Sequence, residues 1–290
     1  MAQATQAAAV VPPDREFKSF YTPGVHADKC MYPDRLDTYG CGCWHNCSYC
    51  YARFLNELRG NWHPYNPKVA DIGKIEKTIN KLPPGSVVRM GGMTDCFQPI
   101  ERIMRVTLET IKLLNRYRIG YLIVTKSPLV SYPPYLNAMD PDLAHIQVSV
   151  TSLSHKLSKR YEVAPPPEQR VQAILTLQRH GFDVAIRLSP LIEEYMDFYQ
   201  LNGLGIDKCI VEFLRINTRM SFDFCGVNFD KYSLWSRNYR HLPLEEKLRI
   251  IDKVKLPNIS VCEKVSEHYD YWKNNYNPNP ADCCNLRICS

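Results

Sequence analysis

Segments typical of buried strands alternate with amphipathic helical segments through most of the chain, and this alternation constrains the fold more than any other feature. Val87 to Met90 is predicted as a buried strand, and the apolar residues of Glu101 to Tyr117 recur with the period of a helix face. Further strands are predicted over 121–125, 145–150, 183–188, 209–214 and 259–262, and further helices over 166–180 and 244–255. These six or seven strand–helix steps predict an α/β fold around a parallel sheet.

The length of 290 residues suits one large domain, and no repeat or long linker divides the chain. The Ala-rich residues 1–15 lack a helical period and are predicted to be a disordered leader. Residues 16–220 are predicted to form the barrel core, and 221–290 an aromatic, basic and cysteine-rich C-terminal extension packed on it. No apolar run reaches the roughly 18 residues that span a membrane, and no secretory signal is recognisable. We therefore expect a cytoplasmic protein without a membrane partner.

Three of the twelve cysteines lie within eight residues, with the spacing CxxxCxxC: Cys43, Cys47 and Cys50. Thiolates suit iron–sulfur clusters, but the usual ferredoxin site uses four cysteines. Three close ligands therefore indicate a cluster with one iron left open for chemistry.

Other uses of these cysteines remain open at this point. Cys47 and Cys50 form a CxxC that Cys283 and Cys284 could complete into a tetrahedral zinc site, or a CxxC that does redox chemistry. Disulfides are disfavoured because the cysteine content lies under the roughly 8–10% typical of disulfide-built secreted domains.

The loop resembles the signature of the radical S-adenosylmethionine (SAM) superfamily. The segments 42–53, 94–101 and 124–128 together resemble its spore photoproduct lyase branch, and the likeness covers roughly residues 35–215. It implies a partial (β/α)6 barrel and a 4Fe–4S cluster whose open iron binds SAM. It also implies reductive cleavage of SAM to a 5′-deoxyadenosyl radical, with flavodoxin or ferredoxin as the electron donor.

The resemblance also implies which residues bind SAM. Tyr49 would lie near the adenine, and the backbone carbonyls of Gly91 and Gly92 near the amino group, an approach that glycine permits. Lys126 would pair with the SAM carboxylate, and Ser149 would contact the ribose or the methionine moiety. Each could instead be an ordinary polar residue at a strand end.

Three further residues are candidates at the mouth of the barrel. Asp95 is the candidate acid partner of the SAM amine, because the family's glycine motif ends in glutamate and this chain has Met93 there. Arg187 lies in an apolar strand, where a charge requires an anionic partner, either a ligand or an acid such as Glu212. Cys96 is a candidate hydrogen-atom donor, or a small buried residue.

The remaining cysteines are dense toward the C-terminus and could hold a second metal or iron–sulfur cluster. The alternative is buried or free thiols, because their spacing matches no known motif. The candidates are Cys225, Cys262, Cys283, Cys284 and Cys289.

Aromatic and basic residues interleave between 221 and 241, a pattern that suits base stacking and phosphate contact but also an aromatic lid on the barrel. The net charge of +6 permits a polyanionic partner without requiring one. The candidate nucleic-acid contacts are Trp235, Arg237, Tyr239 and Arg240.

The resemblance favours a nucleobase substrate, most specifically a modified thymine in DNA. The reaction would be an isomerisation or a lyase-type C–C bond cleavage, as in phage enzymes of thymine hypermodification that act in the host cytoplasm. Two other classes stay open: a radical SAM enzyme acting on a peptide or small metabolite, and a nonenzymatic iron–sulfur or zinc protein that binds nucleic acid.

Overall fold

The computed structural model describes residues 17–22, 29–217 and 226–287, so the predicted leader lies outside the described residues. An eight-stranded sheet has the order β1-β2-β5-β6-β7-β8-β9-β12, and every pairing in it is parallel except that of β1 with β2. The strands are β1 (Phe20–Tyr21), β2 (Arg35–Leu36), β5 (Val87–Met90), β6 (Gly120–Thr125), β7 (Ala144–Ser149), β8 (Asp183–Leu191), β9 (Cys209–Phe213) and β12 (Ile259–Val261).

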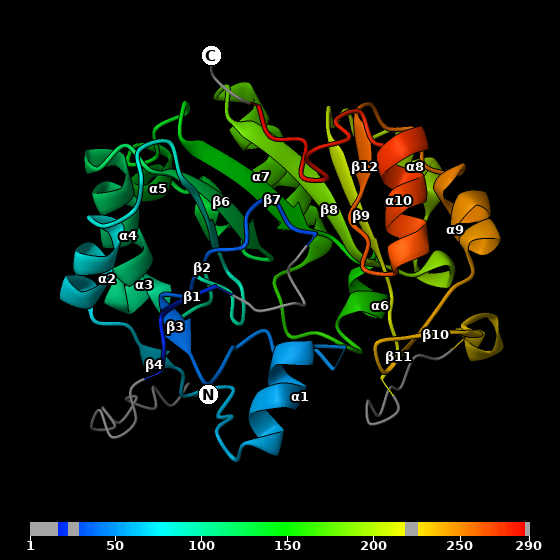
Figure 1. The fold of residues 1–290 in the computed structure, drawn as a ribbon, viewed down its shortest axis with the longest axis horizontal. Helices are drawn as coiled ribbons and strands as arrows, with labels where there is room; N and C mark the ends of the chain where they lie inside the picture. Colours follow the sequence, from blue (N-terminus) through cyan, green and yellow to red (C-terminus); the bar gives the residue numbers. More distant parts are fainter. Residues whose placement is uncertain (1–16, 23–28, 218–225, 288–290) are drawn as a thin grey trace, which may run out of the picture.

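Helices surround the outer side of this curved sheet (Figure 1), and the main hydrophobic core lies between helices and strands. The helices are α1 (Tyr51–Leu58), α2 (Ile72–Ile79), α3 (Glu101–Met104), α4 (Val106–Arg116), α5 (Pro133–Leu136), α6 (His155–Ser158), α7 (Pro167–Arg179), α8 (Phe198–Asn202), α9 (Leu244–Ile251) and α10 (Ser266–Asn275). Two small antiparallel pairs join β3 (Tyr39–Gly40) to β4 (Lys68–Val69) and β10 (Leu234–Ser236) to β11 (Tyr239–His241).

The mostly parallel α/β architecture confirms the predicted fold class, and each of the six predicted strands appears within a few residues of its expected bounds. The single helix predicted over 101–117 is wrong, because the chain breaks at Arg105 in the left-handed region, with a φ of 54°. The buried Glu101 carboxylate accepts the backbone N–H groups of Thr107 and Leu108 and so starts a second helix, α4. The helix predicted over 244–255 ends earlier, at Ile251.

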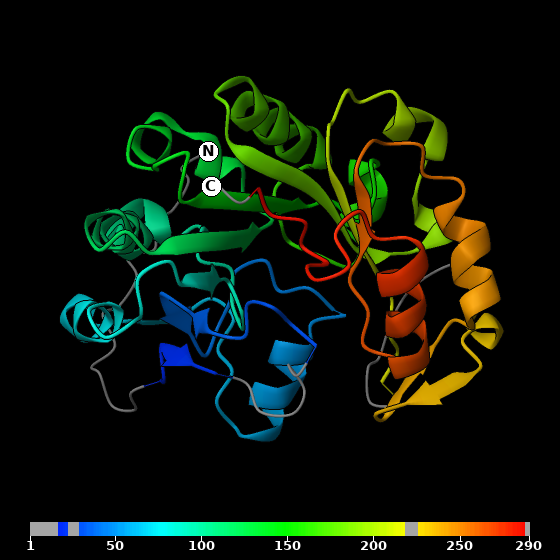
Figure 2. The same ribbon diagram turned by 45° about the horizontal axis from the view of Figure 1, so that its top comes forward.

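The segment after α10 runs back across the strands (Figure 2). Cys284 and Leu286 pack there against Leu122 of β6. The Arg287 backbone N–H donates to the Asp183 carboxylate at 2.9 Å, which fixes the segment to the start of β8. This C-terminal segment therefore covers part of the sheet's inner face. In the described ranges, no helix is long and apolar enough to cross a membrane.

Candidate active site

A pocket lies where the cysteine loop meets the carboxyl ends of the parallel strands, the position at which such sheets bind ligands. It brings together every residue expected to bind the cluster or SAM. Those lining residues are Cys43, Cys47, Tyr49, Cys50, Gly91, Gly92, Asp95, Lys126, Ser149 and Arg187. Their convergence is observed, whereas their individual roles remain predictions.

Backbone turns shape the cysteine loop. The Asn46 N–H donates to the Cys43 carbonyl at 3.0 Å, and the Cys50 N–H to the Cys47 carbonyl at 3.2 Å. Cys50 then caps α1, because its sulfur accepts the Arg53 N–H. The loop and the first turn of α1 thus direct three thiols toward one pocket.

Burial raises the pKa of the Cys43 and Cys47 thiols, although the Lys126 ammonium partly offsets the effect at Cys47. Redox-active CxxC pairs depend on a lowered thiol pKa, whereas burial acts in the opposite direction at Cys47. A metal centre supplies the positive charge that buried thiolates require. The donor set therefore fits an iron–sulfur cluster.

In the described ranges, no three His, Cys, Asp or Glu side chains lie close enough together to hold a single metal ion. This excludes the zinc site that required Cys47, Cys50, Cys283 and Cys284 around one ion. A 4Fe–4S cluster differs, because each thiolate binds a different iron and the thiols therefore stand apart.

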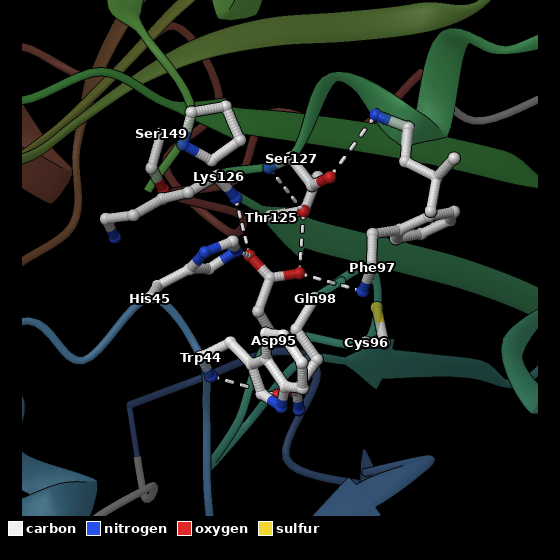
Figure 3. Close-up of polar contacts among 12 residues, drawn as sticks. Trp44, His45, Asp95, Cys96, Phe97, Gln98, Thr125, Lys126, Ser127 and Ser149 are labelled. Atoms are coloured by element: carbon white, nitrogen blue, oxygen red, sulfur yellow. Dashed lines mark hydrogen bonds and ion pairs between the residues drawn. The ribbon is translucent and has the colours of Figure 1, made fainter. Parts of the chain in front are cut away.

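Asp95 forms the polar centre behind the loop (Figure 3). Its carboxylate pairs with His45 Nε2 at 3.0 Å, accepts the Thr125 hydroxyl at 2.7 Å and accepts the Lys126 backbone N–H at 2.7 Å. These partners outweigh burial and lower the pKa of Asp95 to about 2. Asp95 therefore ties the cysteine loop, through His45, to the end of β6.

The glycine turn after β5 requires its glycines. Gly91 has a φ of +83°, and a Cβ there would stand 2.4 Å from the Val124 carbonyl oxygen. The buried Asp37 carboxylate accepts the backbone N–H groups of Gly92 at 2.8 Å and Met93 at 3.0 Å. The Gly92 carbonyl accepts the Tyr51 hydroxyl. Asp37, which sequence reasoning missed, thus fixes the turn that faces the pocket.

Asp37 makes the stability of the protein depend on pH. Burial raises its pKa from 3.8 to about 6 despite the N–H donors. The folded state therefore binds this proton more tightly than the unfolded state does, and the resulting stabilisation is lost as the pH rises through about 6. Asparagine mimics the protonated acid and does not titrate. The free energy of unfolding of the native protein, minus that of Asp37→Asn, should therefore fall by up to about 3 kcal/mol between pH 4 and 7. Urea unfolding measures this difference.

Asp252→Asn serves as the control for this titration, because the Asp252 side chain is 83% exposed. Its stability difference from the native protein should stay nearly constant over the same range. A constant difference for Asp37→Asn as well would contradict a raised pKa in the folded protein.

A buried ion pair supports the part of the pocket that contains Tyr49 and Ser149. Arg170 of α7 lies 2.5 Å from Glu162, and both side chains are fully buried. Glu162 also accepts the Tyr49 hydroxyl at 2.8 Å, and Arg170 donates to the Ser149 carbonyl at 3.2 Å. The Lys126 ammonium lies 5.4 Å from the centre of the Tyr49 ring. Glu162 and Arg170 thus hold two of the expected SAM residues in place.

Arg187 has the anionic partner that its apolar strand required. Its guanidinium donates to Glu212 at 2.7 Å and to the Gln147 side chain at 2.7 Å. The Glu212 pairing was the protein-based alternative to a ligand contact. Because Arg187 also lines the pocket, a ligand contact through its remaining N–H groups stays a prediction.

Cys96 is fully buried in the main core and is not among the lining residues of the pocket. Figure 3 shows it on the far side of Asp95 from Lys126. The structure therefore does not bring this expected hydrogen donor to the substrate side of the site; its placement fits the small buried residue.

The thiols of Cys262, Cys283 and Cys284 lie close enough together to shift one another's pKa, lowering that of Cys262 and raising that of Cys283. They form no metal-holding group among the described side chains. Cys225 and Cys289, the other members of the expected auxiliary site, lie outside the described residues. The ten described cysteines are all free of disulfides.

The expected nucleic-acid contacts fall on the β10–β11 hairpin, whose turn residues Arg237 and Asn238 have positive φ. Trp235 is 53% exposed, and the Arg240 guanidinium lies 5.1 Å from the centre of its ring. Tyr239 lies 4.8 Å from the guanidinium of Arg215, a residue that lines the pocket. The hairpin is thereby connected to the pocket.

The fold and site define a class: α/β barrels that carry a three-cysteine cluster loop beside the carboxyl ends of their strands. The chain matches the radical SAM superfamily over residues 38–198, more than half of its length. The protein belongs to the radical SAM superfamily. Membership implies a 4Fe–4S cluster and SAM as cofactors, and the three thiols in the pocket fit the cluster.

Two uncharacterised proteins are similar to the chain in sequence. An uncharacterised protein of Methanocaldococcus jannaschii is 30% identical over 172 residues, which cover 56% of this chain and 62% of that protein. An uncharacterised protein of Acidianus two-tailed virus is 25% identical over 196 residues, covering 60% and 64%. The chain thus matches less than two thirds of the length of either relative.

Solved structures of spore photoproduct lyase share the fold. A mutant with bound AdoMet and dinucleoside spore photoproduct gives a TM-score of 0.60 at 14% identity, covering 86% of this chain and 77% of that one. The lyase complexed with the dinucleoside spore photoproduct gives 0.59 at 14% identity, covering 89% and 77%. At these identities the likeness concerns the fold alone.

Proposed function

We propose that this radical SAM enzyme abstracts a hydrogen atom from a nucleobase, most specifically a modified thymine in DNA. The reaction would be an isomerisation or a C–C bond cleavage. When bound, the cluster and SAM supply a 5′-deoxyadenosyl radical for this abstraction, after an electron arrives from a flavodoxin- or ferredoxin-type donor.

Within this proposal, Cys43, Cys47 and Cys50 hold the cluster, Lys126 pairs with the SAM carboxylate, and Tyr49 lies against the adenine. Ser149 contacts the ribose or the methionine moiety. The glycine turn offers the Gly91 and Gly92 carbonyls to the SAM amine, although Gly92 already accepts the Tyr51 hydroxyl.

For Asp95 we propose a positioning role in place of the amine contact that its sequence position implied. Its two oxygens already accept from the Thr125 hydroxyl and the backbone N–H groups of Phe97 and Lys126, and one of them pairs with His45. We propose that it positions the cysteine loop and Lys126 around SAM; a contact with the SAM amine would have to displace one of these four partners.

The observation that carries the choice of substrate is the position of Arg215. Its guanidinium lies 5.3 Å from the Tyr51 ring centre beside the cysteine loop and 4.8 Å from that of Tyr239 in the hairpin. An exposed Trp235 beside Arg240 offers a stacking surface and a cation on the same hairpin. The solved lyase structures that bind a dinucleoside photoproduct and share this fold support the same choice.

Isotope transfer tests the proposal. We expect that DNA deuterated at the thymine methyl group or its modified side chain passes deuterium into 5′-deoxyadenosine, measured by mass spectrometry. DNA deuterated only at the sugar C1′ is the control and should pass none. Unlabelled 5′-deoxyadenosine with every natural and modified DNA would contradict a thymine substrate and favour a peptide or metabolite.

A further inference from the structure

One wall of the pocket carries more cations than carboxylates. Arg89 of β5, Arg187 of β8 and Arg215 after β9 line it together with Glu212. Lys264, which follows β12, reaches the same region, with its ammonium 5.7 Å from the centre of the Tyr51 ring. Arg89 and Arg187 lie on two strands of the sheet, and Arg215 and Lys264 follow two others; the three arginines line the same pocket as the Glu212 carboxylate.

Among the described residues, only Arg187 forms an ion pair with the Glu212 carboxylate, at 2.7 Å. In the part of the chain that the structure describes, Arg89, Arg215 and Lys264 form no ion pair with a carboxylate. The Nε of Arg89 is buried and has no hydrogen-bond partner. A buried donor without a partner is costly and rare in proteins, which indicates that an external acceptor binds there.

The three cations also lie close enough to repel one another. Arg215 and Lys264 both contact the Tyr51 ring. Burial together with Arg215 and Arg89 lowers the pKa of Lys264 to about 8, although the Glu212 carboxylate and the Cys262 thiol act in the opposite direction. Placing like charges close together lowers the stability of the fold. Such a cluster is typical of a site where a bound anion neutralises the charges.

We propose that Arg89, Arg215 and Lys264 bind a phosphate group of the nucleotide that carries the target base. This inference rests on the proposed function and names how its substrate is held. Guanidinium groups match phosphate oxygens in pairs, and the surplus of cations exceeds what the single carboxylate of SAM would neutralise. Arg215 also contacts Tyr239 of the hairpin, so the phosphate site continues the path from that surface to the pocket.

Binding of phosphorylated and unphosphorylated probes tests the inference on full-length, cluster-reconstituted protein with SAM present. Equilibrium dialysis should show that thymidine 5′-monophosphate and the dinucleotide TpT bind at least about 10-fold tighter than thymidine. Arg89→Gln and Arg215→Gln should each remove about 10-fold from nucleotide binding and leave thymidine and SAM binding unchanged. Arg116→Gln, an exposed arginine on α4, is the matched control and should change none of these affinities.

Thermal unfolding of the variants separates a phosphate-binding role of these arginines from a structural role. In the described ranges Arg89 has neither an ion-pair partner nor an aromatic ring to lose, so Arg89→Gln should unfold at or above the native temperature, whereas Arg215→Gln also loses its contacts with Tyr51 and Tyr239 and should unfold at a slightly lower temperature. Equal binding of thymidine and its phosphate would overturn the inference, as would variants that weaken SAM instead of the nucleotide. If phosphate-dependent binding persists while no DNA passes deuterium to 5′-deoxyadenosine, the proposed function fails and the phosphate site stands.

Discussion

Replacing Cys47 with serine is expected to remove the iron–sulfur cluster and, with it, all cleavage of SAM. Cys47 is the buried middle ligand of the loop and lies beside Lys126, so a neutral hydroxyl in its place leaves the second iron without a thiolate. Iron content should fall from about four atoms per chain to a small fraction of that amount. Iron analysis and the visible absorption of anaerobically reconstituted protein measure the loss.

Cys209→Ala is the control for that experiment, because Cys209 is also a buried thiol but lies in β9 within the main core. It should keep the cluster and lose only modest stability. A Cys47→Ser protein with full iron content and normal SAM cleavage would remove Cys47 from the ligand set.

Breaking the Arg170–Glu162 pair is expected to have the largest effect on stability. Arg170→Met leaves the Glu162 carboxylate buried without its partner, which should lower the free energy of unfolding by roughly 3–5 kcal/mol. It should also loosen Tyr49, because Glu162 holds that hydroxyl. Urea unfolding of the native protein and the variant measures the first effect, and SAM affinity the second.

An ion pair on the surface serves as the control that shows whether burial causes the large loss of stability expected for Arg170→Met. Arg116 contacts Glu76 at 3.2 Å with its side chain 66% exposed, and Arg116→Met should cost at most about 1 kcal/mol. The double variant Arg170→Met with Glu162→Gln removes both charges and should recover much of the lost stability. Equal losses of unfolding free energy for Arg170→Met and Arg116→Met would contradict the claim that the buried Arg170–Glu162 pair stabilises the pocket.

The strands and the cysteine loop were predictable because each depends on local pattern. Apolar runs near Val87 and Cys209 identify buried strands in any context, and the spacing of the three cysteines specifies one loop. The break at Arg105 was not predictable, because it depends on a carboxylate that is buried only in the folded protein.

The supporting residues of the site were missed for a similar reason. Asp37 and Glu162 lie far in sequence from the groups they hold, and His45 looks like a spacer between two cysteines. Arg170 carried a usable signal, since it falls on the apolar face of a predicted helix. The reasoning that expected an anionic partner for Arg187 applies equally to Arg170.

The cluster of Arg89, Arg215 and Lys264 also could not be predicted from the sequence. Each of Arg89, Arg215 and Lys264 is unremarkable in its own segment, and only the sheet brings Arg89 and Arg215 to one pocket and Lys264 to the Tyr51 ring that lines it. Net charge gave no hint of this arrangement, because it counts charges without placing them.

The central claim is that the loop of Cys43, Cys47 and Cys50 holds a cluster that cleaves SAM. The direct measurement is chromatographic detection of 5′-deoxyadenosine after anaerobic reduction of the reconstituted protein with SAM, beside the Cys47→Ser variant. The account predicts 5′-deoxyadenosine from the native chain and none from the variant. A native protein with a full complement of iron that forms no 5′-deoxyadenosine would contradict it.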